Sequence, residues 1–171
     1  FTDVQLPLKH DQLMLAPKQE AKVLQALNLK STDHILHVGT GSGFFTAMLA
    51  ILSKHVVTIE IHEQLLIQAR LIHQADKLSN ITYIHDDGIF GHLEYAPYDV
   101  IVFTGGLVKE PIGLKEQLKM GGKLFLFEGN KTLMRANLIE KVGSNEYETS
   151  SIFEDVVPLL ISKNKSPKFV F

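Results

Sequence analysis

The sequence predicts a doubly wound α/β fold, with a mostly parallel sheet of about seven strands that ends in an antiparallel hairpin. Short apolar runs alternate with segments of helical periodicity through the first three quarters of the chain, which is typical of a parallel sheet with helices on both faces. In the last quarter, two strand-like segments flank a single turn. With 171 residues, 45% of them hydrophobic, the chain fits one domain spanning residues 1–171 around a buried core.

The first half of the chain alternates regularly between helix and strand. Pro17 suits the first turn of a helix that ends before Ser31 and carries Ala21, Leu24 and Leu27 on one side. A buried strand at 35–38, a glycine turn at 39–43 and an apolar helix at 45–54 follow. We then expect a β-branched strand at 56–61, a helix at 63–77 with Leu66, Ala69 (or Arg70) and His73 at helical spacing, and a strand at 81–84.

The second half of the chain begins with two more buried strands, at 100–103 and 124–127, and we expect a helix over 112–119 between them. The hairpin is expected to pair 138–142 with 147–153 around the turn Gly143-Ser144-Asn145. A helix over 133–140 is the competing prediction, because Leu133, Ala136 and Ile139 also fit a helical stripe.

Composition excludes several classes of function. Lys plus Arg number 17 against 19 for Asp plus Glu, so no basic excess is available to neutralise a nucleic-acid backbone. No cysteine is present, which excludes disulfides, thiolate metal sites and a cysteine nucleophile and is compatible with a reducing cytoplasm, where we expect the protein to act.

We also expect neither a membrane span nor a metal site. The longest apolar run, at 47–52, is far below the ~20 residues of a membrane helix. Among the eight histidines, His34 and His37 lie three apart on a strand and point to opposite faces, which does not favour a structural metal. Because residue 1 is Phe rather than Met, we expect the natural N-terminus to lie upstream.

The strongest local signal is a glycine-rich turn between the first strand and the next helix, comprising Gly39, Thr40, Gly41, Ser42 and Gly43. Alternate glycines let the backbone approach a ligand closely, next to the free N–H groups of a helix start. A dinucleotide fingerprint would need its third glycine at position 44, which is Phe, and a P-loop would need a following Gly-Lys-Ser/Thr. The spacing is that of the Rossmann-like methyltransferases, which bind nucleoside–methionine cofactors, although a glycine turn without a ligand stays open.

Acidic residues follow the next two strands. Glu60 ends the second strand 21 positions after Gly39, where this topology places an acid that accepts hydrogen bonds from ribose hydroxyls. Asp86-Asp87-Gly88 follows the third strand, and Asp87 would accept a hydrogen bond from an adenine amino group. A surface glutamate and a plain turn are the respective alternatives.

The order of these motifs resembles the protein-L-isoaspartate O-methyltransferase family, particularly its divergent bacterial members, from about Gln12 to the C-terminus. The telling pieces are Leu15-Ala16-Pro17, Val38-Gly39-Thr40-Gly41-Ser42-Gly43, Ile59-Glu60, Asp87-Gly88, Ala96-Pro97-Tyr98-Asp99, Gln117-Leu118-Lys119 and Gly121-Gly122. The resemblance implies S-adenosylmethionine as methyl donor and the α-carboxylate of an isoaspartyl residue in a damaged protein or peptide as acceptor. It also implies that the protein is a monomer or homodimer and binds neither nucleic acid nor a membrane.

The resemblance further implies two sets of site residues. The cofactor would be bound by His37, Gly39, Thr40, Gly41, Ser42, Gly43, Glu60, Ile61, Asp87 and Gly88. The acceptor would lie near Gln12, Leu15, Pro17 and Thr104. A plain turn at Thr104-Gly105-Gly106 is the alternative for that segment.

Two departures from the family pattern bear on activity. Where family members carry Thr and Ser hydroxyls, the serine placed to hydrogen-bond the substrate, this chain has Leu13 and Leu15. Where the family has an acid before the first glycine, which helps to hold the donor's ammonium, this chain has His37, either in contact with the cofactor or packed under the loop. A family member with another acceptor, or a cofactor-binding module without methyl transfer, are therefore alternatives.

Overall fold

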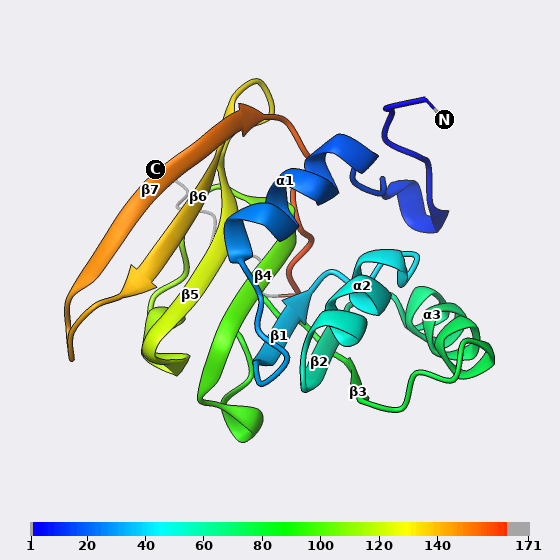
Figure 1. The fold of residues 1–171 in the computed structure, drawn as a ribbon. Coiled ribbons are helices and arrows are strands. Elements are labelled where there is room, and N and C mark those ends of the chain that lie inside the picture. Colours follow the sequence, from blue (N-terminus) through cyan, green and yellow to red (C-terminus); the bar gives the residue numbers. More distant parts are fainter. Residues whose placement is uncertain (1, 164–171) are drawn as a thin grey trace.

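A computed structural model describes residues 2–163 and contains one seven-stranded sheet (Figure 1). The strand order is β3-β2-β1-β4-β5-β6-β7, in which the first five strands along the chain run parallel and the last two are antiparallel to their neighbours. This confirms the predicted Rossmann-like α/β class, with a mostly parallel seven-stranded sheet that ends in an antiparallel hairpin. The strands are β1 (His34–Val38), β2 (His55–Glu60), β3 (Ile81–His85), β4 (Tyr98–Leu107), β5 (Leu118–Gly129), β6 (Met134–Lys141) and β7 (Tyr147–Asp155).

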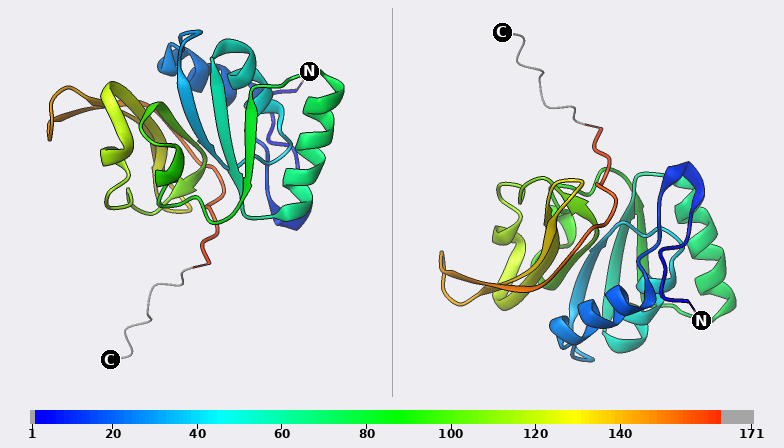
Figure 2. Two further views of the ribbon diagram at one scale, coloured as in Figure 1. Left: turned by 90° about the horizontal axis from the view of Figure 1, so that it is seen from below. Right: turned by 90° about the horizontal axis from the view of Figure 1, so that it is seen from above.

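The three α-helices of the described chain all pack on one face of the sheet (Figure 1; Figure 2). They are α1 (Pro17–Leu27), α2 (Phe44–Leu52) and α3 (Glu63–Ala75). The expectation of helices on both faces is wrong for residues 2–163, because the second face is covered by loops with two single turns of 3-10 helix, η2 (Leu93–Tyr95) and η3 (Lys115–Gln117). In particular, the helix expected over 112–119 is reduced to η3, and β5 already begins at Leu118.

Two apolar clusters, one on each face, form the core. Alternate residues of β1 serve the two clusters: Ile35 packs beneath α1 and α2, whereas Leu36 packs under the loops of the second face. The helix-side cluster is closed by Phe125 and Phe127, whose rings meet edge to face. Because β1, β2 and β4 are covered on both faces, their sequences read as continuous apolar runs.

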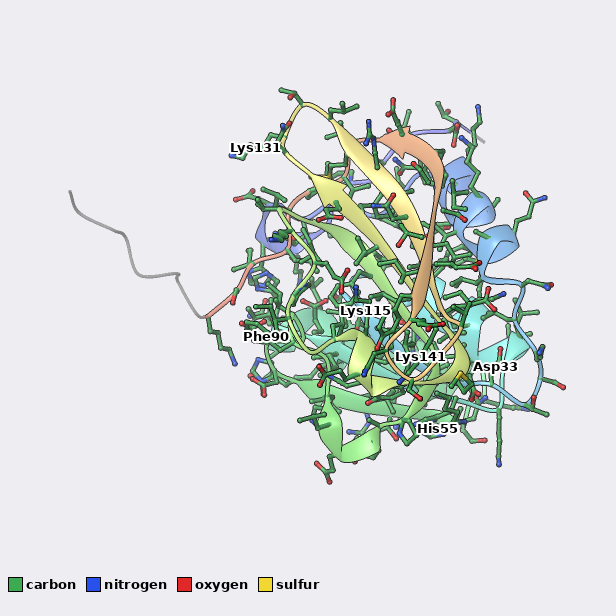
Figure 3. All side chains as sticks on the ribbon, turned by 90° about the vertical axis from the view of Figure 1, so that its left-hand side faces the viewer. Asp33, His55, Phe90, Lys115, Lys131 and Lys141 are labelled. Atoms are coloured by element: carbon green, nitrogen blue, oxygen red, sulfur yellow. The ribbon has the colours of Figure 1, made fainter. Side chains whose placement is uncertain are left out.

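The last quarter of the chain is a hairpin, and the alternative helix over 133–140 is wrong (Figure 3). In β6, Ala136 packs in the helix-side cluster and Ile139 in the opposite one, so the spacing of these residues reflects burial on two faces of a strand. Lys131 in the turn before β6 and Lys141 at its end mark the two ends of this strand in Figure 3.

The face that α1 turns to the core agrees with the expected one at two of three positions, since Leu27 is buried and Leu24 is partly buried against the helix-side cluster. Ala21 is exposed, and the buried stripe runs through Glu20, Val23 and Leu27. The helix begins where the Gln19 side chain accepts a hydrogen bond from the Ala16 N–H at 2.8 Å. No helix among residues 2–163 is long and apolar enough to cross a membrane.

Ile101 is fully buried in the central strand β4. The variant Ile101→Ala should lower the free energy of unfolding by about 2–5 kcal/mol, because the surrounding side chains fill only part of the cavity that the missing side chain leaves. Urea denaturation measures this loss. Ile152→Ala on the edge strand β7, where the side chain is 40% exposed, serves as the control and should cost about 1 kcal/mol or less. Equal losses in the two variants would contradict the assignment of Ile101 to the core.

Candidate functional site

An open cleft of about 630 Å³, partly continuous with solvent, lies at the carboxyl ends of the parallel strands, where open α/β sheets bind ligands. The strand ends supply Gly39 after β1, Glu60 at the end of β2, Asp87 after β3 and Thr104 in β4. A second cavity of about 300 Å³ adjoins it on the side of α1. The two share five lining residues, Leu8, Leu13, Gly39, Gly41 and Thr104.

The glycine turn is the floor of both cavities, and close approach explains its sequence. Gly39 adopts a φ of +96°, and a Cβ there would stand 2.9 Å from the Thr104 hydroxyl oxygen. Gly43 adopts +86°, and its Cβ would stand 2.7 Å from both Ala69 Cβ and His73 Nε2 on α3. Gly41 and Ser42 line cavities, whereas Gly43 lines neither and instead lets the turn pack against α3.

The carboxylate of Glu60 joins the glycine turn to the start of α3. Its Oε2 accepts a hydrogen bond from the Gly41 N–H at 2.9 Å, and its Oε1 accepts one from the His62 N–H at 3.0 Å. Each oxygen keeps a lone pair, so the carboxylate remains an acceptor for a ligand in the cleft. Glu60 is 6% exposed, and Ile61 beside it also lines the cleft.

The acids after β3 contact the segment that follows β7. Asp87 Oδ2 accepts hydrogen bonds from the Ser162 hydroxyl at 2.6 Å and the Lys163 N–H at 2.8 Å, while Asp86 pairs with the Lys163 ammonium at 3.2 Å. Gly88 lines the cleft as expected.

The segment after β7 forms one wall of the cleft. Its Leu159 bridges Gly106 in parallel: the Gly106 N–H donates to Pro158 O and the Leu160 N–H donates to Gly106 O, both at 2.8 Å. A Cβ on Gly105 would stand 2.5 Å from Leu160, so the glycines after Thr104 make room for this strap. We call residues 157–163 the C-terminal strap.

His37 lies under the glycine turn and lines neither cavity, which favours the packed position over a cofactor contact. Its Nδ1 lies 2.9 Å from the Thr46 hydroxyl, and its Nε2 lies 3.1 Å from the Thr104 hydroxyl. Because Thr104 donates its proton to Gly39 O at 2.8 Å, it accepts from the Nε2–H, and Nδ1 accepts from Thr46. Burial, with a smaller contribution from His73, lowers the pKa of His37 to about 3.

The expected acceptor residues are brought together only in part. Gln12 lines the cleft, Leu15 lines the second cavity, and Thr104 lines both, whereas Pro17 begins α1 and lines neither. Leu13 lines both cavities. Thr40 lines the second cavity, with its hydroxyl 2.6 Å from that of Thr58.

Several lining residues were missed by the sequence analysis. His62 stacks on His10 at 4.3 Å, and only the tertiary fold brings the two rings together. The C-terminal strap carried no motif. Glu20, which lines the second cavity, could have been found from the sequence. It is spaced i, i+3 and i+7 with Val23 and Leu27, which places it on the same buried face of the helix. Within residues 2–163, no group of three or more acidic or histidine side chains is placed to hold a metal ion.

Comparison with known proteins gives concordant results. Residues 1–161 match the family model "Protein-L-isoaspartate(D-aspartate) O-methyltransferase (PCMT)". The chain is 34% identical over 148 residues, 86% of its length, to a protein-L-isoaspartate O-methyltransferase of Magnetococcus marinus. It is 37% identical over 157 residues, 91% of its length, to that of Aeromonas hydrophila. It spans 65% and 75% of these two relatives, and 57% of the one from Roseobacter denitrificans.

Solved structures share the fold. A protein-L-isoaspartate O-methyltransferase superposes with a TM-score of 0.84 at 22% identity over 94% of this chain and 53% of its own. A putative one from Plasmodium falciparum, solved with S-adenosyl-L-homocysteine, gives 0.82 at 21% identity over 94% of this chain and 81% of its own.

The neutral state of His37 predicts a loss of stability in acid. In the unfolded chain the imidazole has a pKa of about 6.5 and is protonated below that pH, whereas in the folded protein it stays neutral down to about pH 3. The free energy of unfolding therefore falls as the pH drops from about 6.5 to about 3. Compared with His37→Gln, the wild-type chain should lose roughly 2 kcal/mol of unfolding free energy between pH 7 and pH 5. Urea denaturation of both proteins at each pH measures this. A difference that does not change with pH would show that His37 titrates normally.

Proposed function

Because the chain belongs to the protein-L-isoaspartate O-methyltransferase family, we propose that it transfers a methyl group from S-adenosylmethionine to the α-carboxylate of isoaspartyl residues in damaged proteins. The observation that carries the proposal is the carboxylate of Glu60, fixed by two backbone N–H groups beside the glycine turn and open to the cleft.

The residues around the cleft fit such a cofactor. A carboxylate at the end of the second strand suits the two hydroxyls of a ribose, and Ile61 and Ile89 offer apolar surface for a base. Gly41 brings bare backbone to the boundary of both cavities, where a Cβ would stand 3.2 Å from Leu8 Cδ1, so only glycine leaves room for a ligand between this turn and Leu8. Asp87 would bind the adenine amino group through Oδ1, which within residues 2–163 accepts one hydrogen bond, from the Ile89 N–H at 3.1 Å.

The chemistry asks for positioning rather than for proton transfer. When bound, S-adenosylmethionine would supply a sulfonium methyl group; the ionised carboxylate would attack the methyl carbon in line, with S-adenosylhomocysteine leaving as the neutral thioether. This acceptor needs no general base. The residues of this chain therefore act by orientation and by excluding water. Leu8, Leu13 and Leu160 are the apolar groups that would keep water from the reacting atoms. Thr104, held by His37 and Gly39, fixes the β4 edge of the cleft.

The acceptor side favours weak repair activity, or binding without transfer. Leu13 and Leu15 offer no hydrogen bond to a substrate carboxylate, and such a bond to a charged group is worth about 1.5–3 kcal/mol. We expect the protein to act in the cytoplasm as a monomer or homodimer, and size-exclusion chromatography with light scattering tests the latter.

Replacing the proposed ribose acceptor should weaken nucleoside binding. In Glu60→Ala, the dissociation constant for S-adenosylhomocysteine should rise by about tenfold to a hundredfold, because the charged acceptor and the fixing of Gly41 are both lost. Titration calorimetry measures it. Glu63→Ala, with the same change of charge on an exposed residue nearby, should bind as the wild type does. An absence of heat from the folded wild-type protein would refute the proposal.

Restoring a hydroxyl at position 15 should raise repair activity. In Leu15→Ser, kcat/KM on an isoaspartyl peptide should increase about tenfold over the wild type, because a hydrogen bond to the substrate carboxylate is regained. Leu15→Ala removes the same bulk without supplying the hydroxyl and is the matched control. Turnover by the wild type at the level of the Aeromonas hydrophila relative would show that another donor already binds the substrate.

A further inference from the structure

A buried carboxyl group without a partner lies on α1. Glu20 is 4% exposed and belongs to the helix stripe that faces the core. Within residues 2–163, its side chain accepts no hydrogen bond and forms no ion pair. Acidic side chains are rarely buried this far unless they are paired, because leaving water costs the charged form several kcal/mol. The site therefore lacks a counter-charge.

Among residues 2–163, no other charged side chain lines the cavity that Glu20 faces. Glu20 lines the second cavity together with Leu8, Leu13, Met14, Leu15, Gly39, Thr40, Gly41, Ser42, Phe45 and Thr104, none of which is charged. The nearby hydroxyls have other partners: Thr40 contacts Thr58, and Ser42 contacts Met14. Burial raises the pKa of Glu20 to about 7, so the carboxyl gains its charge readily only when a cation arrives.

The position of Glu20 relative to the cleft indicates which cation. Glu60 and Asp87 line the cleft but not the second cavity, whereas Glu20 lines the second cavity but not the cleft. The two cavities share Gly39 and Gly41 in their linings, together with the side chains of Leu8, Leu13 and Thr104. A ligand whose nucleoside lies against Glu60 and which extends across the glycine turn therefore ends beside Glu20.

We propose that Glu20 binds the α-ammonium group at the amino-acid end of the methyl donor. The inference rests on the proposed function, since it requires a nucleoside ligand with an aliphatic ammonium. It also accounts for His37, which stands where the family pattern has an acid: His37 is neutral and lies beneath the turn, outside both cavities, so it cannot supply the negative charge. Glu20, which lines the second cavity, supplies that charge.

The test compares two ligands that differ only beyond the thioether. S-adenosylhomocysteine carries the amino-acid end, whereas 5′-methylthioadenosine lacks it. At pH 8, Glu20→Gln should raise the dissociation constant for S-adenosylhomocysteine by about tenfold or more and change that for 5′-methylthioadenosine by less than about twofold. Titration calorimetry measures both. Glu116→Gln, an exposed residue far along the chain, is the control with the same change of charge.

The outcomes separate the two proposals. If both ligands bind the wild type and Glu20→Gln weakens both equally or neither, Glu20 does not contact the ammonium, and the proposed function still stands. If neither ligand binds the folded wild type, the proposed function fails and this inference with it. Thermal denaturation shows whether Glu20→Gln is folded, which we expect because the amide has the same shape without the buried charge.

The dependence on pH gives a second readout. Of residues 2–163, no titratable side chain other than Glu20 lines the second cavity, and His37 beneath the turn stays neutral above about pH 3. Glu20, with its pKa of about 7, is mostly protonated at pH 6 and mostly ionised at pH 8. The affinity of the wild type for S-adenosylhomocysteine should therefore fall about tenfold from pH 8 to pH 6, whereas Glu20→Gln should show no such fall. A parallel fall in both proteins would overturn the inference.

Discussion

The hydrogen bonds that the Glu60 carboxylate accepts from Gly41 and His62 fix the geometry on which the rest of the cleft depends. They join the turn between β1 and α2 to the start of α3, two segments that belong to different βαβ units. With both N–H groups satisfied by one side chain, the glycine turn is fixed at its middle as well as at its ends. The floor of the cleft is thereby ordered before any ligand contributes contacts.

Beneath this floor lies a neutral hydrogen-bonded network in place of a buried ion. The Thr46 hydroxyl on α2 donates to His37, His37 donates to the Thr104 hydroxyl, and Thr104 donates to the carbonyl of Gly39. Each of the three side chains therefore has a partner. A fully paired neutral network of this kind avoids the desolvation cost of a buried charge. Glu20 of α1 lines the second cavity next to this turn, and burial raises the pKa of its carboxyl group to about 7.

The sequence predicted the strands and the site wherever local pattern and tertiary packing agree. The parallel strands, the glycine turn and Glu60 all follow from apolar runs and fixed spacing. The helix expected over 112–119 failed because Leu114 and Leu118 pack into the second-face cluster from loop and strand conformations, which periodicity does not distinguish from a helix. Glu20 was missed because the buried stripe of α1 was predicted to contain Ala21, the next residue. A shift of one position turns the helix face by about 100°, which decides whether Glu20 or Ala21 faces the cavity.

Because of the C-terminal strap, the cleft is built from segments that lie far apart in the sequence. The strap's bridge at Leu159 pairs with Gly106 in the middle of the sheet, so one wall of the site comes from residues more than fifty positions distant from the strand they contact. Contacts this remote in sequence require a long loop to close, which carries an entropic cost. During synthesis the site is therefore completed only once nearly the whole described chain has left the ribosome. A ligand that binds only the finished cleft stabilises the folded protein against reopening of this last contact.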